Sequence, residues 1–159
     1  MVFLSLLLIT STVLASGPAI KGEYPKGPDA SMTPGSLCDR PDEYRYAEKI
    51  PYCNRDVDSS LKADIFQDYR NIGWQLPANQ RSSYKIDHLI PLCMGGSNQE
   101  NNLWPQHVSV YQQTDLLEQV GCDKMKAGKL KQAEAIKMLL AAKRDLTLVK
   151  KTLDYFQSL

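Results

Sequence analysis

Three short stretches give the strongest indication of the fold of this chain: Asp87-His88-Leu89-Ile90-Pro91, Gly95-Gly96-Ser97-Asn98 and Asn101-Asn102-Leu103-Trp104-Pro105. The first ends an alternating β-like run, the second is rich in turn residues, and the third resumes an apolar strand. Together they predict two neighbouring strands joined by a loop. Side chains alternate along a strand, which would place Asp87 and His88 on opposite faces. We therefore expect a bulge or a strand end at this point.

Helical patterns flank the predicted hairpin. Before it, Ser59 and Ser60 can cap a helix whose apolar side chains recur on one face as far as Ile72, and Gly73 supplies a stop. After it, apolar spacing predicts helices over about 110–120, 130–143 and 146–156. A hairpin among several helices indicates the α+β class.

The amino-terminal segment indicates export. Residues 1–15 carry no charged side chain and are largely apolar, with small residues near Ala15, which is typical of a cleaved signal peptide. A membrane anchor would need about 20 apolar residues, so we expect no membrane association of the mature chain. Residues 16–36 are rich in Gly, Pro and Ser and predict a flexible leader. Residues 37–159 suffice for a single domain.

The chain has four cysteines, all beyond the predicted signal peptide: Cys38, Cys53, Cys93 and Cys122. An even number in an exported protein favours two disulfides, in the periplasm or the extracellular medium. Three pairings are possible. We favour Cys38 with Cys53, which closes a short loop, and Cys93 with Cys122, which staples the hairpin loop to the next helix. A four-cysteine zinc site lacks the close cysteine pairs that such sites show.

Charge gives a weaker signal. The formal net charge is +1, so the whole molecule does not show the strong positive charge of many nucleic-acid-binding proteins. Basic residues nevertheless dominate residues 124–151: Lys124, Lys126, Lys129, Lys131, Lys137, Lys143, Arg144, Lys150 and Lys151. This run is either a solvated helix face or a surface that contacts phosphates.

The hairpin residues fit the chemistry of phosphodiester hydrolysis. That reaction needs a base to deprotonate water, a cation near the phosphate and a fixed geometry between them. The imidazole of His88 is a suitable base near neutral pH, and the carboxylate of Asp87 is a hard oxygen ligand for Mg²⁺ or Mn²⁺. The amide of Asn102 can hold the loop backbone and so fix the distance between strand and metal.

The run from Asp87 to Leu92, the pair Gly95-Gly96 and Asn102-Leu103-Trp104-Pro105 resemble the HNH endonucleases of the His-Me finger (ββα-metal) superfamily, in particular secreted bacterial members. The resemblance is most specific over residues 84–106. It implies a hairpin-plus-helix core surrounded by additional helices and stabilised by disulfides. It also implies that His88 is the general base, Asp87 a metal ligand and Asn102 the middle asparagine of the motif.

The chain departs from this family in the helix after the hairpin. Tyr111 stands where the family offers a further Asn or His to the metal. The candidates to replace that ligand are His107, Gln112, Gln113 and Asp115, and we take His107 as the candidate because it is the only other histidine. The paired cysteines of the family's zinc knuckle are also absent, so a Cys93–Cys122 disulfide would take over their structural role.

The expected function is therefore that of an exported, metal-dependent endonuclease. Its substrate would be DNA, with RNA as a second candidate, cleaved with little sequence preference because no separate base-reading module is recognised. The missing helix ligand and the nearly neutral charge leave an alternative of another class, in which an exported module on the same scaffold binds nucleic acid without cleaving it.

Overall fold

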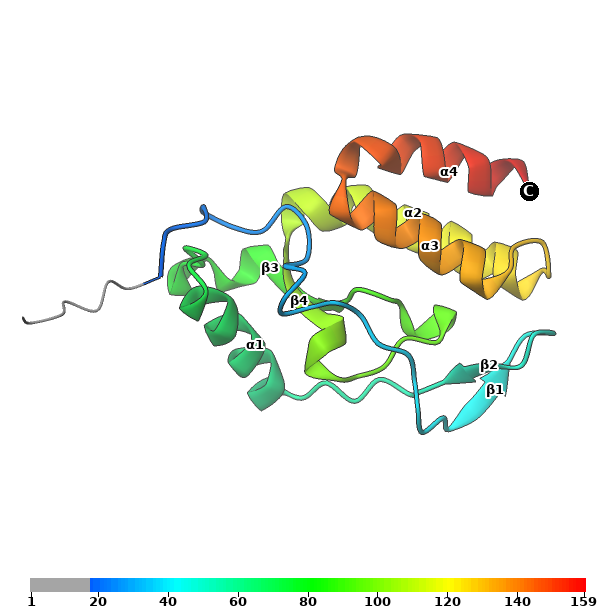
Figure 1. Cartoon of the computed structure of the whole chain (residues 1–159), viewed down its shortest axis with the longest axis horizontal. Coiled ribbons are helices and arrows are strands. Elements are labelled where there is room, and N and C mark those ends of the chain that lie inside the picture. The colour runs from blue at the N-terminus through cyan, green and yellow to red at the C-terminus, as the bar shows by residue number, and fades with distance from the viewer. Residues whose placement is uncertain (1–17) are drawn as a thin grey trace, which may run out of the picture.

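The computed structural model describes residues 18–159, and the predicted signal peptide lies outside this range. These residues form an α+β fold with two antiparallel hairpins and four α-helices (Figure 1). In chain order the elements are β1 (Glu43–Arg45), β2 (Ile50–Tyr52), α1 (Ser59–Asn71), β3 (Tyr84–His88), β4 (Leu103–His107), α2 (Val108–Lys126), α3 (Gln132–Arg144) and α4 (Val149–Ser158).

The hairpin β3–β4 lies at the centre of the fold, between α1 and the group formed by α2, α3 and α4 (Figure 1). Its strands pair antiparallel from Tyr84 opposite His107 to His88 opposite Leu103. One apolar cluster joins the hairpin to α1 and includes the fully buried Trp104. A second cluster joins α2, α3 and α4 and includes Phe156. The first cluster thus fixes the hairpin strands against α1, and the second holds Ile90 and Met94, from the loop between β3 and β4, against the three helices.

Two helices differ from the sequence-based expectation at their ends. The N-cap of α1 is Asp58 rather than Ser59 or Ser60, because the Asp58 carboxylate accepts a hydrogen bond from the backbone N–H of Leu61 at 2.8 Å. Helix α2 is longer than predicted and begins directly after β4. The hairpin and α2 are therefore joined without a loop, which fixes the direction of the helix relative to the strands.

Residues 18–36, which composition predicts to be part of a flexible leader, pack along the domain. The backbone N–H of Lys21 donates to the carbonyl of Gly73 at 2.9 Å, and Gln75 donates to the carbonyl of Gly22 at 2.8 Å. Thr33 is fully buried, and its hydroxyl donates to the carbonyl of Leu103 at 2.9 Å. These hydrogen bonds help to offset the conformational entropy that a Gly- and Pro-rich segment loses when it is ordered.

Both favoured disulfides are present. Cys38–Cys53 ties the entry of the domain to the end of β2, and Cys93–Cys122 ties the loop between β3 and β4 to α2. The short hairpin β1–β2 was not anticipated, and its turn is anchored where Glu48 accepts a hydrogen bond from the backbone N–H of Gln132 at 2.9 Å. Within residues 18–159, no helix is both long and apolar enough to cross a membrane.

Candidate functional site

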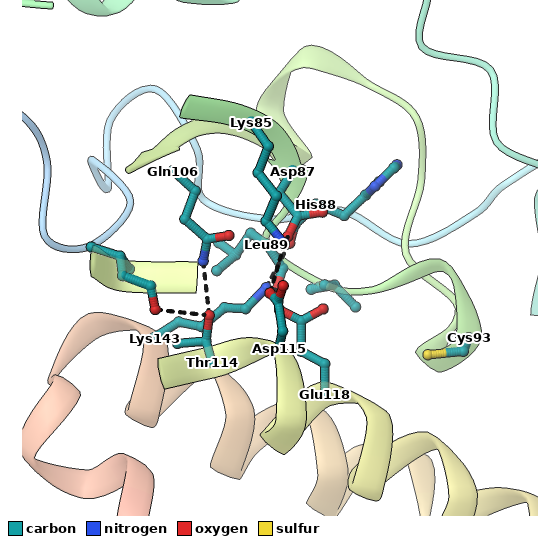
Figure 2. Close-up of polar contacts among 12 residues, drawn as sticks. Lys85, Asp87, His88, Leu89, Cys93, Gln106, Thr114, Asp115, Glu118 and Lys143 are labelled. Atoms are coloured by element: carbon teal, nitrogen blue, oxygen red, sulfur yellow. Dashed lines mark hydrogen bonds and ion pairs between the residues drawn. The ribbon is translucent and has the colours of Figure 1, made fainter. Parts of the chain in front are cut away.

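Strand β3 ends at His88, as predicted, and its last two side chains point in opposite directions. The pairing with β4 is regular up to this point, with Asp87 opposite Trp104 and His88 opposite Leu103. Asp87 faces α2, whereas the His88 side chain extends away from that helix (Figure 2). The end of the strand thus separates two groups of polar residues, one around each side chain.

Hydrogen bonds fix the ring of His88. The imidazole is almost completely buried, with Nε2 lying 3.0 Å from Oδ1 of Asn98. The Asn98 amide nitrogen donates to the carbonyl of Asn54 at 2.7 Å, so the Asn98 oxygen must face the ring. Nε2 of His88 therefore carries the hydrogen and donates it to Asn98. In the neutral ring this leaves Nδ1 as the proton-accepting atom.

The surroundings of His88 favour the neutral ring. Burial lowers the pKa of His88 below its ordinary value, and the positive charges of Arg55 and Lys143 lower it further. The hydrogen bond to Asn98 and the charge of Asp87 act in the opposite direction, but the pKa remains lowered. His88 is therefore an unprotonated base at neutral pH, and Nδ1 is its proton-accepting atom, with a terminal nitrogen of Arg55 3.4 Å from it.

Three carboxylates gather on the other face of β3. One oxygen from each of Asp87, Asp115 and Glu118 lies within 4.8 Å of the other two. Asp87 comes from the end of β3, whereas Asp115 and Glu118 are three residues apart and therefore on the same face of α2. Figure 2 shows the three side chains meeting between the strand and the helix. The direct junction of β4 with α2 places this helix face opposite Asp87.

Two lysines contact these carboxylates. Nζ of Lys85 lies 3.0 Å from Asp87 and 2.6 Å from Asp115, and its side chain is about one-third exposed, at 35%. Nζ of Lys143 lies 2.7 Å from Glu118 and is completely buried. Lys143 also donates to the backbone carbonyls of His88 at 2.6 Å and Leu89 at 3.1 Å. It therefore links α3 to the end of β3 as well as to the carboxylates.

Proton affinities differ within this cluster. Burial raises the pKa of Glu118 to about 7, with the charge of Asp87 adding to the effect and Lys143 opposing it. Burial also acts on Asp87, but there the charges of Lys143 and Lys85 prevail and the pKa is lowered. Asp87 is thus ionised near neutral pH, whereas Glu118 gains or loses a proton in that range.

The donor set fits a hard divalent cation. Carboxylate oxygens are the ligands that Mg²⁺ and Mn²⁺ prefer. Among the described residues, the buried atoms Oδ2 of Asp87 and Oε1 of Glu118 have no hydrogen-bond partner, although a lysine lies at ion-pair distance from each. Asp87, Asp115 and Glu118 would hold the ion. Lys85 is the more exposed of the two lysines and so the one that an ion would displace.

Asn102 has the bracing role expected for it. Its side chain is fully buried; Oδ1 accepts from the backbone N–H of Ile90 at 2.9 Å, and Nδ2 donates to the carbonyls of Ile90 at 3.0 Å and Ser97 at 2.8 Å. Gly96 is packed into the same place, where a Cβ atom would lie 1.8 Å from the Ile90 carbonyl oxygen. The loop between β3 and β4 can therefore close only with glycine at this position.

The structure does not bring His107 to Asp87. His107 is paired with Tyr84 at the opposite end of the hairpin, and its ring stacks on Tyr24 with centroids 4.0 Å apart. Its Nδ1 accepts from the backbone N–H of Ser109 and caps α2. Of the other candidate ligands, Gln112 and Gln113 are exposed, and the Gln113 side chain donates to the backbone carbonyl of Ser109. Asp115 is the candidate that lies beside Asp87.

Sequence reasoning missed several residues of the site. Lys143 was assigned to a basic run, although its spacing of four from Leu139, itself four from Ala135, places it on the buried face of α3. Glu118 lies four residues after the buried Thr114 on α2, a comparable signal. Arg55 comes from a distant loop, and no local pattern predicts its contact with His88.

Comparisons of the chain with protein-family models, with curated proteins and with solved structures found no match.

Proposed function

We propose that this protein is an exported, metal-dependent endonuclease that hydrolyses phosphodiester bonds of DNA, and of RNA as a second substrate. The hairpin β3–β4 with α2 would be the hairpin-plus-helix core of a ββα-metal nuclease. The observation that carries the proposal is the fixed state of His88, whose Nδ1 is a proton acceptor next to the cationic Arg55 and one residue from a carboxylate cluster.

In the proposed reaction, Nδ1 of His88 removes a proton from a water molecule as the water oxygen attacks phosphorus. The bond between phosphorus and the 3′ oxygen breaks, and the leaving oxygen takes a proton from a solvent water molecule, so the products carry a 5′-phosphate and a 3′-hydroxyl. Asn98 holds the ring so that Nδ1 faces the reacting water, and Asn102 keeps the loop closed around it. A divalent cation bound by Asp87 would lie on the other side of the strand end from His88 and would supply positive charge to the phosphate from that side.

Export is part of the proposal. The described residues contain two disulfides, which fit an oxidising compartment such as the periplasm or the extracellular medium. The predicted signal peptide at residues 1–15 would deliver the chain there.

Plasmid cleavage by the purified mature chain tests the proposal. We expect degradation with Mg²⁺ or Mn²⁺, none with a chelator, and a loss of about 10²–10⁴-fold in rate for His88→Ala, the range for removal of a general base. His107→Ala is the matched variant, and it should cleave at the wild-type rate because His107 lies at the far end of the hairpin. Unchanged cleavage by His88→Ala would exclude His88 as the base.

One observation favours the alternative of nucleic-acid binding without cleavage. Lys85 and Lys143 already balance much of the charge of the three carboxylates, as in a structural ion-pair cluster. Calorimetric titration with Mn²⁺ separates the two functions. A catalytic site should bind Mn²⁺ at least tenfold more weakly in Asp87→Asn and normally in Asp154→Asn, whose carboxylate pairs with Lys150 on the exposed side of α4. DNA binding without Mn²⁺ binding or cleavage would support the alternative.

A further inference from the structure

Arg55 holds its guanidinium beside the proposed base without an acidic partner. One terminal nitrogen donates to the carbonyl of Ile86 at 3.2 Å, and the other lies 3.4 Å from Nδ1 of His88. The residue is exposed, and among residues 18–159 no carboxylate lies within ion-pair distance of it. A positive charge therefore stands at the proton-accepting atom of His88 without an ion-pair partner among these residues.

These two contacts leave the guanidinium able to bind an anion. Arginine has five N–H donors in a planar fork, and two are used here. The contact with Nδ1 is long for a hydrogen bond and is made to a neutral acceptor, so it is weak. Two phosphate oxygens are better acceptors for the fork, because a charge-assisted, bidentate contact is shorter and stronger than a bond to a neutral nitrogen.

The backbone of the Arg55 segment is held by neighbours that also hold His88. Asn98 accepts from Nε2 of His88 and donates to the carbonyl of Asn54, so one side chain ties the base to the residue before Arg55. The N–H of Asn54 donates to Asp42 at 2.7 Å, and the preceding Cys53 is bonded to Cys38. The exposed Arg55 side chain thus extends from a fixed backbone.

We infer that Arg55 is a substrate-binding residue whose guanidinium binds the non-bridging oxygens of the phosphate beside Nδ1 of His88. The inference rests on the proposed nuclease function for the identity of the substrate, a phosphodiester. In the free protein Arg55 covers Nδ1. Substrate draws the guanidinium onto the phosphate, which uncovers Nδ1 for the attacking water and places the positive charge where negative charge develops.

Binding of inorganic phosphate to the metal-free mature chain tests this directly. The chain contains two histidines, so the imidazole signals of His88 and His107 can be followed separately by NMR at constant pH. Phosphate should shift the His88 signals and leave those of His107 in place. We expect the dissociation constant to rise at least tenfold in Arg55→Met and by less in Arg55→Lys, which keeps the charge but loses the fork.

Arg40→Met is the matched control. Arg40 is also exposed and lies two residues after Cys38, as Arg55 lies two residues after its disulfide partner Cys53, and the Arg40 side chain makes no hydrogen bond or ion pair within the described residues. Its phosphate affinity should equal that of the wild type. Thermal unfolding of each variant, with a midpoint close to the wild-type value, shows that a lost affinity is not lost folding. Equal phosphate affinity in the wild type and Arg55→Met, including no binding in either, would overturn the inference.

Hydrolysis of bis(p-nitrophenyl) phosphate separates this inference from the proposed function. This small substrate offers one phosphodiester and no distant contacts, so Arg55→Met should raise KM at least tenfold, whereas Arg40→Met should leave KM unchanged. If Arg55→Met binds phosphate more weakly but the wild-type chain cleaves no phosphodiester, the phosphate site is supported and the nuclease is refuted. If cleavage depends on His88 but KM is unaltered in Arg55→Met, the nuclease is supported and the phosphate site at Arg55 is refuted.

Discussion

Asn102 shows how much of the site depends on single buried amides. Its three hydrogen bonds join the two ends of the loop that separates β3 from β4. Each bond satisfies a backbone group that water cannot reach, and a buried group left without a partner costs about 1–3 kcal/mol. The position of the loop, and with it the position of Asn98 against His88, therefore depends on this side chain.

We expect Asn102→Ala to lower the free energy of unfolding by about 2–4 kcal/mol, because it leaves the polar backbone groups of Ile90 and Ser97 unpaired. Urea unfolding followed by circular dichroism measures the change. The neighbour Asn101 is exposed and its side chain accepts one hydrogen bond, from Ser36, so Asn101→Ala should cost less than about 1 kcal/mol. Similar losses in both variants would contradict the bracing role.

Glu118 predicts a pH dependence of stability in the metal-free protein. Its pKa is about 7 in the folded chain against an ordinary value of 4.5, so the folded state holds a proton that the unfolded state releases. The resulting stability is complete below pH 4.5 and is lost as the pH rises through about 7. Urea unfolding with chelator across this range should show a decline in the wild type that Glu118→Gln lacks. Parallel curves for the two proteins would refute the assignment.

Among the elements, α3 acts on the site through one side chain. Lys143 lies on the buried face of α3. It donates to the carbonyls of His88 and Leu89 at the end of β3 and pairs with Glu118 on α2. Three elements that are distant in sequence thus share one ammonium group. A buried ion pair is weak evidence for stability by itself, but removal of one partner leaves the other without compensation.

Above pH 7, where Glu118 is ionised, replacement of Lys143 by methionine should therefore destabilise the fold by about 3–5 kcal/mol, the usual cost of breaking a buried pair. Adding Glu118→Gln in the same chain should recover part of this loss, because the unpaired buried carboxylate is then removed. Lys137→Met, on the exposed side of α3, is the control and should change stability by about 0.5 kcal/mol or less. Equal losses for Lys137→Met and Lys143→Met would show that the ion pair between Lys143 and Glu118 does not contribute to the free energy of unfolding.

The elements themselves were largely predictable, and the reasons lie in local patterns. The alternation of apolar and polar side chains predicts a strand end near His88, where β3 ends, and the spacing of apolar residues predicts the helices that follow the hairpin. The hairpin β1–β2 was missed because each strand has three residues, too few to show a periodicity. The packing of residues 18–36 was missed because it depends on backbone bonds to Gly73 and Gln75, which composition does not reveal.

The candidate site was predictable only where its residues are close in sequence. Asp87, His88 and Asn102 lie within one hairpin, and the roles that we propose for them come from its motif. Arg55 and Lys143 reach the same strand end from opposite sides in the sequence, and only the tertiary fold brings them there. His107 was chosen for its chemistry as the second histidine, but its position in the register with Tyr84 takes it away from Asp87.

For the molecule as a whole, the two disulfides lie around the central hairpin and close loops of different length. The sequence separations are 15 for Cys38–Cys53 and 29 for Cys93–Cys122. Loop-closure entropy predicts that loss of either bond, by paired Cys→Ala substitution, lowers the free energy of unfolding by about 3–4 kcal/mol, with the larger effect for the longer loop. Chemical denaturation of the two double variants measures this. A negligible loss for Cys93–Cys122 would show that packing alone holds the loop against α2.

The Cys38–Cys53 bond has a consequence for when the proposed enzyme becomes dangerous to the cell that makes it. The bond closes two residues before Arg55, on the backbone that carries the guanidinium to His88. In the reducing cytosol this covalent tie does not form. Before export, a newly made chain would therefore hold Arg55 less firmly, while the DNA of the producing cell is within reach. Oxidation after export would complete the proposed phosphate site only when that DNA is on the other side of a membrane.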